Sequence, residues 1–204
     1  MIAQLLLGHQ TEKVRTFLSL SPAERLAFTG WSTSGWVRWL EGLRGAYERR
    51  MNRMCEILDA DKDGIRDVNG PRDSVVIFKT PRLYFDWPRG GMFVWVRVHL
   101  EHHRFMAREW RIGRAFTGKE LSDALLMFLT KAPYKVLAAP GRMFAATEQI
   151  KEERAWKYFR LCFAAESEDK VDICSRMFVR GVHDFFEIKD ERKIEKLVEE
   201  ANAE

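Results

Sequence analysis

The chain has 204 residues, 46% of them hydrophobic, and so can bury a core in one or two domains. Lysine and arginine outnumber aspartate and glutamate by 34 to 30, and this net charge of +4 gives little support to a nucleic-acid-binding protein. No apolar run approaches the roughly 18 residues of a membrane span, and three cysteines without a Cys-x-x-Cys pair favour a reduced, cytoplasmic setting.

Residues 1–34 predict helices rather than a leader peptide. Residues 1–7 are apolar but lack a basic start and a cleavage site. Ser21, Pro22 and Glu24 form a capping box with proline at the first helical position, which predicts a short helix running to Gly30.

Residues 35–58 predict one long helix. Apolar residues recur three or four positions apart and so share one face of a helix, which would be about 36 Å long at 1.5 Å per residue. The other face mixes arginines with glutamates, and it fits a solvated or interdomain face with ion pairs better than a nucleic-acid patch. The arginines are Arg38, Arg44, Arg49, Arg50 and Arg53.

The segment Asp59–Gly64 is a candidate calcium loop. Aspartates at alternate positions, Asp59, Asp61 and Asp63, offer oxygen ligands before a glycine that permits a sharp turn. However, Gly70 stands where an EF-hand needs its bidentate glutamate. We therefore favour a surface loop and expect no metal site, with calcium at Asp59–Asp63 kept as an alternative.

Four short segments predict strands, because β-branched and aromatic residues dominate them. They are residues 74–79, 92–98, 134–139 and 157–163. After the second of these come His99, Glu101, His102 and His103, which we interpret as a solvated polar loop rather than a metal site, since zinc needs three or four ligands fixed in space.

Helices alternate with these strands. Thr117 and Glu120 form a second capping box, and Ser167 is the expected N-cap of a helix with Val171, Cys174, Phe178, Val182 and Phe185 on its buried face. Residues 189–204 predict a charged, solvated helical tail. The pattern indicates an α/β fold with a short mixed or antiparallel sheet packed against helices.

Arg160 is the most informative single residue. It lies in the middle of the strand Lys-Tyr-Phe-Arg-Leu-Cys-Phe, residues 157–163, among aromatic and apolar neighbours. A buried guanidinium needs an anionic partner, and its planar fork matches a carboxylate with two parallel hydrogen bonds. The partner could be a structural carboxylate of the protein or that of a ligand.

Two glycine-containing turns precede Arg160 in the sequence. Gly90 and Gly91 lead into the strand Met-Phe-Val-Trp, and Pro140 and Gly141 follow Val-Leu-Ala-Ala, with Phe144 three residues further on. Glycine permits a positive φ or a close approach of the backbone to a ligand.

The order of these motifs resembles the C-terminal half of the class I/II, fold-type I aminotransferases, which use pyridoxal phosphate (PLP). The similarity is greatest to the aromatic, kynurenine and 2-aminoadipate aminotransferases and covers residues 35–186. The resemblance implies that Arg160 binds the α-carboxylate of the substrate, that Gly90 and Gly91 shape the pocket wall, and that Pro140 and Gly141 border the entrance. It also implies a small domain over residues 59–188, joined by the interdomain helix 35–58.

The family's Schiff-base lysine motif, and the residues that flank its PLP ring, have no counterpart here. We therefore predict no catalytic residue in this chain, and we interpret it as a truncated piece of a larger enzyme, with residues 1–34 as a helical remnant carrying an insertion. The resemblance implies PLP as cofactor, amino acids and 2-oxo acids as substrates, and a homodimer. From the composition we expect neither nucleic-acid nor membrane partners.

The sequence thus predicts the C-terminal segment of an aminotransferase that transfers an amino group between an aromatic amino acid and a 2-oxo acid, and that is inactive alone. The alternative is a non-enzymatic binding module or pseudoenzyme, with calcium at Asp59–Asp63.

Overall fold

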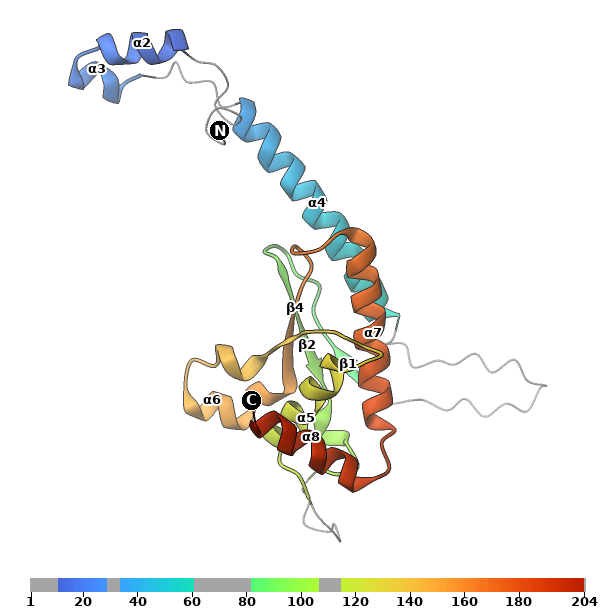
Figure 1. The fold of residues 1–204 in the computed structure, drawn as a ribbon. Coiled ribbons are helices and arrows are strands. Elements are labelled where there is room, and N and C mark those ends of the chain that lie inside the picture. The colour runs from blue at the N-terminus through green and yellow to red at the C-terminus, as the bar shows by residue number, and fades with distance from the viewer. Residues whose placement is uncertain (1–10, 29–33, 61–81, 107–114, 204) are drawn as a thin grey trace, which may run out of the picture. The chain divides into compact units, whose positions relative to one another are not determined.

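The computed structural model describes residues 11–28, 34–60, 82–106 and 115–203 (Figure 1). The chain divides into two compact units, Met1–Glu48 and Arg49–Glu204. The division falls within helix α4 (Ser34–Asp59), whose bounds confirm the long helix predicted for residues 35–58.

The first unit contains α2 (Thr11–Ser19), α3 (Pro22–Leu26) and the beginning of α4. The capping box predicted at Ser21 is confirmed, because its hydroxyl accepts from the Glu24 N–H and the Glu24 carboxylate accepts from the Ser21 N–H. Helix α3 ends at Leu26, earlier than predicted, and Gly30 lies outside the described residues.

The second unit is built on a four-stranded sheet with the order β1-β2-β4-β3 and antiparallel neighbours throughout. The strands are β1 (Leu83–Tyr84), β2 (Phe93–Val98), β3 (Ala139–Pro140) and β4 (Tyr158–Cys162). Successive side chains of a strand point to opposite faces of the sheet. On the inner face, Val94 and Val96 of β2 are buried together with Phe159 and Leu161 of β4. The predicted α/β fold is confirmed, whereas the strand predicted for residues 74–79 lies outside the described residues.

The strand predicted over residues 134–139 is wrong except at Ala139. Tyr134, Val136 and Ala138 alternate as buried residues, as the sequence pattern indicates. However, Lys135 has φ of 52° and the Val136 N–H donates to the carbonyl of Leu129. The backbone therefore bonds back to the preceding helix, and only Ala139 and Pro140 join the sheet.

Helices bury the inner face of the sheet. The longer ones in this unit are α5 (Gly118–Thr130), α7 (Glu168–Phe186) and α8 (Glu191–Ala203). The remaining helices are short: the 3₁₀ helices η1 (Leu100–His102), η2 (Gly141–Phe144) and η3 (Ala155–Lys157), and the α-helix α6 (Glu148–Glu153). The buried face predicted for α7 is largely confirmed, because Val171, Phe178, Val182 and Phe185 are buried and Cys174 is partly buried.

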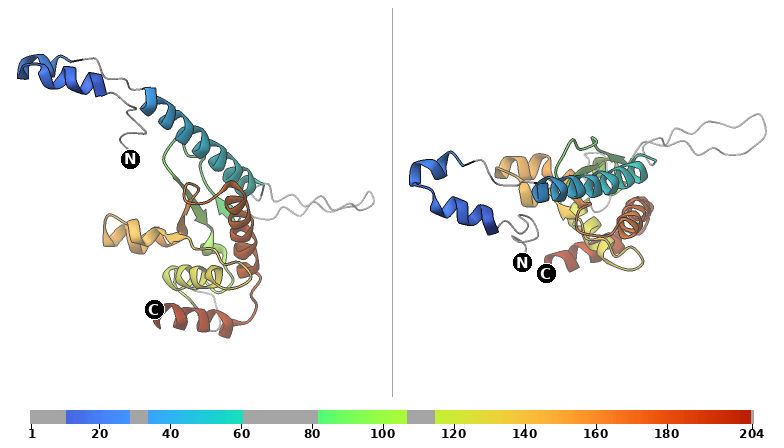
Figure 2. Two further views of the ribbon diagram at one scale, coloured as in Figure 1. Left: turned by 45° about the horizontal axis from the view of Figure 1, so that its top comes forward. Right: turned by 90° about the horizontal axis from the view of Figure 1, so that it is seen from above.

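The last helix differs from the solvated tail predicted for residues 189–204. Ile194, Leu197 and Val198 of α8 are buried, and α8 lies beside α5 (Figure 2). The spacing of these three residues places them on one helical face, so α8 is solvated on its charged side only.

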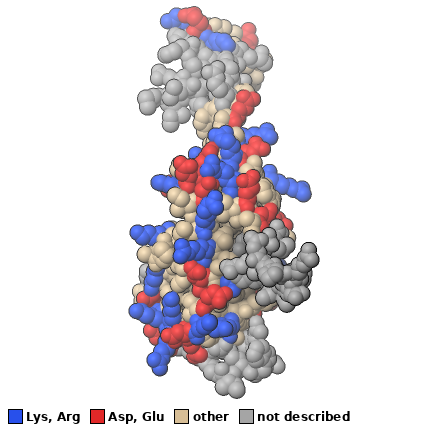
Figure 3. Space-filling view, turned by 90° about the vertical axis from the view of Figure 1, so that its right-hand side faces the viewer, with Lys and Arg blue, Asp and Glu red and all other residues tan. Residues whose placement is uncertain are grey.

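Ion pairs join the end of α4 to α7, as the interpretation of the arginine-rich face predicts. Arg53 contacts Asp172 at 2.7 Å and Glu168 at 3.3 Å, and Arg49 contacts Glu168 at 2.9 Å. Figure 3 shows basic and acidic side chains interspersed over the surface that faces the viewer. Within the described part of the chain, no helix has the length and apolar character needed to cross a membrane.

Candidate functional site

The candidate site lies on the outer face of the sheet, opposite the helix-covered core. Phe93 and Trp95 of β2 and Tyr158 and Arg160 of β4 alternate with the buried residues and so share this face. Trp95 pairs directly with Arg160, and Arg160 also pairs with Ala139 of β3. The arginine therefore lies on an interior strand of the sheet, with a tryptophan beside it.

The guanidinium of Arg160 is held between two aromatic rings. Its Cζ lies 4.0 Å from the ring centroid of Phe93 and 4.0 Å from that of Phe144. Cation–π contacts of this kind orient the guanidinium without using its N–H donors. Among the described residues, no hydrogen bond or ion pair joins the Arg160 side chain to a carboxylate, so the structural ion pair that the sequence left open is not formed there.

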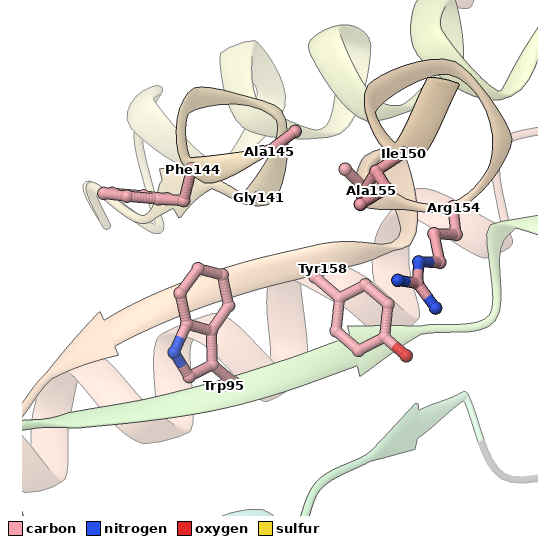
Figure 4. Close-up of a pocket in the computed structure, with 8 residues that line it drawn as sticks. All are labelled: Trp95, Gly141, Phe144, Ala145, Ile150, Arg154, Ala155 and Tyr158. Atoms are coloured by element: carbon pink, nitrogen blue, oxygen red, sulfur yellow. The ribbon is translucent and has the colours of Figure 1, made fainter. Parts of the chain in front are cut away.

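A cavity of about 240 Å³ lies next to Phe144, one of the two rings that hold Arg160 (Figure 4). Trp95 and Tyr158 of the sheet lie on one side of it, and Phe144, Ala145 and Ile150 lie on the other. Trp95 and Phe144 meet edge to face, with ring centroids 5.3 Å apart. The remaining lining residues are Gly141, Arg154 and Ala155. Phe144 contacts Arg160 and also lines the cavity, so the two features adjoin, although Arg160 itself is not among the residues that line the cavity.

The turn at Pro140 and Gly141 is fixed tightly against the sheet. A Cβ added at Gly141 would lie 2.6 Å from the carbonyl oxygen of Ala155 and 2.9 Å from that of Tyr158, so the backbone approaches here as only glycine allows. Arg142 pairs with Asp123 of α5 at 3.2 Å, although burial raises the pKa of the Asp123 carboxyl. These contacts hold η2, and therefore Phe144, over Arg160.

The two glycine turns lie in different places relative to the cavity. Gly141 lines the cavity, and Pro140 belongs to the adjoining strand β3. Gly91 has φ of 85°, which explains a glycine at that position, but neither Gly90 nor Gly91 lines this cavity. Their role in shaping a pocket wall stays a prediction.

The histidine segment is more structured than a solvated loop. His103 is fully buried, its Nδ1 accepts from the Phe105 N–H at 3.2 Å, and its Nε2 lies 3.3 Å from the Phe185 carbonyl oxygen. Glu101 lies 3.6 Å from Lys157 and also contacts Arg97. The described residues hold no group of three or more histidines, cysteines or carboxylates placed to bind a metal ion.

The candidate calcium loop falls mostly outside the described residues, which end at Ala60 and resume at Arg82. Asp59 is described, and its carboxylate accepts from the Trp87 indole N–H at 2.9 Å.

Two curated relatives match part of the chain, although no family model matches it. The chain is 34% identical over 120 residues to an L-tyrosine:2-oxoglutarate aminotransferase of Tapinella panuoides, covering 58% of this chain and 18% of that protein. It is 31% identical over 132 residues to an L-tyrosine:2-oxoglutarate aminotransferase of Serpula lacrymans, covering 63% of this chain and 22% of that protein. The chain thus spans about a fifth of the length of the relatives it matches.

The fold agrees with these matches. The aromatic aminotransferase of C. albicans superposes with a TM-score of 0.52 at 17% sequence identity, covering 76% of this chain and 27% of that one. The likeness in sequence and fold confirms the resemblance to the fold-type I aminotransferases.

Proposed function

We propose that this chain, which resembles part of the fold-type I aminotransferases in sequence and fold, forms the substrate-carboxylate-binding part of an enzyme that moves an amino group between an aromatic amino acid and a 2-oxo acid. Arg160 is the residue proposed to hold the α-carboxylate. The substrate class follows the names of the two relatives, both tyrosine:2-oxoglutarate aminotransferases.

The observation that carries this proposal is the environment of Arg160. Its guanidinium is positioned by Phe93 and Phe144 at 4.0 Å on each ring, yet it has no carboxylate partner among the described residues. A guanidinium held in this way can donate two parallel hydrogen bonds to a carboxylate without first breaking an internal ion pair. The proposed role of Arg160 is therefore to bind and orient the acid end of a substrate.

The described site does not fit the anchoring of PLP. The cofactor would supply the electron sink for amino transfer, but it requires a lysine amine, and none of the residues that line the cavity is a lysine. Lys157, on the neighbouring turn, lies 3.6 Å from Glu101 and over the Trp156 ring. We therefore derive no step through PLP in this chain and propose that it is inactive alone.

The proposal is tested by replacing Arg160 with glutamine. We expect the chain to bind tyrosine and 2-oxoglutarate through their carboxylates, and the Arg160→Gln variant to bind both at least tenfold more weakly, because a desolvated charged hydrogen-bond pair contributes more than about 1.4 kcal/mol. Titrations followed by the arginine side-chain N–H resonances in NMR measure this.

A matched control is Arg176→Gln, which removes an exposed arginine on α7. We expect it to bind both ligands as the wild type does. Equal binding by wild type and Arg160→Gln would refute the assignment of Arg160. In a complete enzyme, Arg160→Lys should raise KM and lower kcat, because a lysine cannot form the bidentate pair.

A further inference from the structure

The guanidinium of Arg160 is open to a ligand along its own plane. Its Cζ lies 4.0 Å from the ring centroid of Phe93 and 4.0 Å from that of Phe144, and a guanidinium this close to an aromatic ring stacks on the face of the ring. The two rings therefore cover the two faces of the group. Arg160 is only partly buried, so a ligand can reach the edge that carries its N–H donors.

Separate elements hold the two rings in place. Phe93 of β2 pairs with Cys162 of β4, so Phe93 and Arg160 are diagonal neighbours on the outer face of the sheet. Phe144 comes from η2, which lies over β4 (Figure 4), and the close packing of Gly141 fixes the start of that turn. The slot between the two rings is thus formed by the folded chain itself, before any ligand binds.

A planar anion fits this slot better than a tetrahedral one. A carboxylate places both oxygens, and the carbon that bears them, in the plane of the guanidinium and accepts two parallel hydrogen bonds there. When a sulfonate places two oxygens in that plane, its third oxygen and its carbon chain leave the plane on opposite sides. They then crowd Phe93 and Phe144, so that either the rings move apart or the hydrogen bonds lengthen and weaken.

We propose that Phe93 and Phe144 are specificity-determining residues, which make Arg160 select a planar carboxylate over a tetrahedral oxyanion such as a sulfonate of the same charge. This inference rests on the proposed role of Arg160 as the carboxylate-binding residue. It assigns to the two rings the choice of anionic group, whatever the rest of the ligand is.

The experiment compares 3-phenylpropanoate with 2-phenylethanesulfonate on the purified chain, in titrations followed by the backbone amide resonances of β4 in NMR. Both ligands carry one negative charge at neutral pH and have the same tail, so the contacts of the tail cancel in the ratio of the two dissociation constants. We expect the wild type to bind the carboxylate about tenfold more tightly than the sulfonate.

Variants of the two rings test whether they cause this preference. Phe144→Leu and Phe93→Leu keep an apolar side chain but remove the flat ring, and each should lower the preference to about threefold or less. Phe144→Tyr keeps the ring face and should keep the wild-type ratio. Met143→Leu introduces the same side chain at a residue of the same turn that is 72% exposed and lines no part of the cavity, and it is the control for substitution itself.

The outcomes distinguish this inference from the proposed function. If Arg160→Gln loses binding but the wild type binds both anions equally, the selectivity is overturned and the carboxylate site stands. A wild-type preference that persists undiminished in both Phe144→Leu and Phe93→Leu would overturn the role of the rings in the same way. Unchanged carboxylate binding in Arg160→Gln, or no carboxylate binding by the wild type, would overturn the proposed function and this inference with it.

Discussion

Tyr134 connects the loop after α5 to helix α7. Its hydroxyl donates to the Asp184 carboxylate at 2.6 Å, and only 9% of the residue is exposed. Burial and this hydrogen bond raise the pKa of Tyr134 to about 12, from an ordinary value of 10.0. The bond thus stabilises the fold only while the phenol keeps its proton.

We expect Tyr134→Phe to lower the free energy of unfolding by about 1 to 2 kcal/mol at neutral pH. The raised pKa means that this contribution is complete below about pH 10 and is lost as the pH rises toward about 12. The difference in stability between wild type and variant should therefore shrink over that interval. Urea denaturation of both proteins at several pH values measures it.

Tyr84→Phe is the matched control, because Tyr84 donates to Asp86 at 2.8 Å but is 49% exposed. Exposed pairs of this kind contribute little, so its unfolding curve should overlay that of the wild type at neutral pH. A difference between wild type and Tyr134→Phe that stayed constant through the alkaline interval would contradict the proposed linkage.

Some residues of the site could be predicted from the sequence and others could not. Arg160 could be singled out because a guanidinium in an apolar strand needs an explanation, and Gly141 because it follows a proline at the end of an apolar run. Arg154 and Ile150 carry no such signal, since Ile150 belongs to the short, mostly charged helix α6 and Arg154 is the residue that follows its last turn. Only the fold brings them next to Trp95, which lies more than fifty positions earlier in the chain.

Helix α5 is the element on which the site depends, because it anchors η2 through Asp123 and packs against α8. Its first turn is closed by the capping box predicted from sequence. The Thr117 hydroxyl accepts from the Glu120 N–H at 3.2 Å, and the Glu120 carboxylate accepts from the Thr117 N–H at 2.7 Å.

We expect Thr117→Ala to destabilise the second unit by about 1 kcal/mol, because the substitution leaves the Glu120 N–H without its cap. Hydrogen exchange of the α5 amides should become correspondingly faster. Ser21→Ala removes the equivalent box from α3 in the other compact unit. It should leave α5 exchange unchanged, and equal effects of the two variants would contradict independent units.

At the level of elements, capping signals predicted helix starts better than alternation predicted strands. A capping box depends on two side chains within one turn, so sequence alone specifies it. The alternating burial of Tyr134, Val136 and Ala138 is real, but a loop that bonds back to α5 produces it as well as a strand does. The charged composition of α8 likewise concealed an apolar face of three residues.

The second compact unit is built of a sheet and helices and carries aromatic side chains on its outer face, and the chain as a whole covers about a fifth of the length of the relatives that it resembles. The sequence could predict that resemblance because its motifs keep their order along the chain. It could not predict the cavity, whose walls come from elements that are separate in the sequence and meet only in the folded structure.

We predict that the purified chain does not transaminate tyrosine with 2-oxoglutarate and forms no specific aldimine with PLP. The physical reason is that no lysine lines the cavity beside Arg160, and Lys157, on the adjoining turn, is held by Glu101 and Trp156. Borohydride reduction after incubation with PLP, followed by peptide mapping, should show only low labelling spread over exposed lysines. Lys157→Arg should give the same pattern as the wild type. Stoichiometric labelling of one lysine, lost when that lysine is replaced by arginine, would mean that the chain holds a cofactor site of its own.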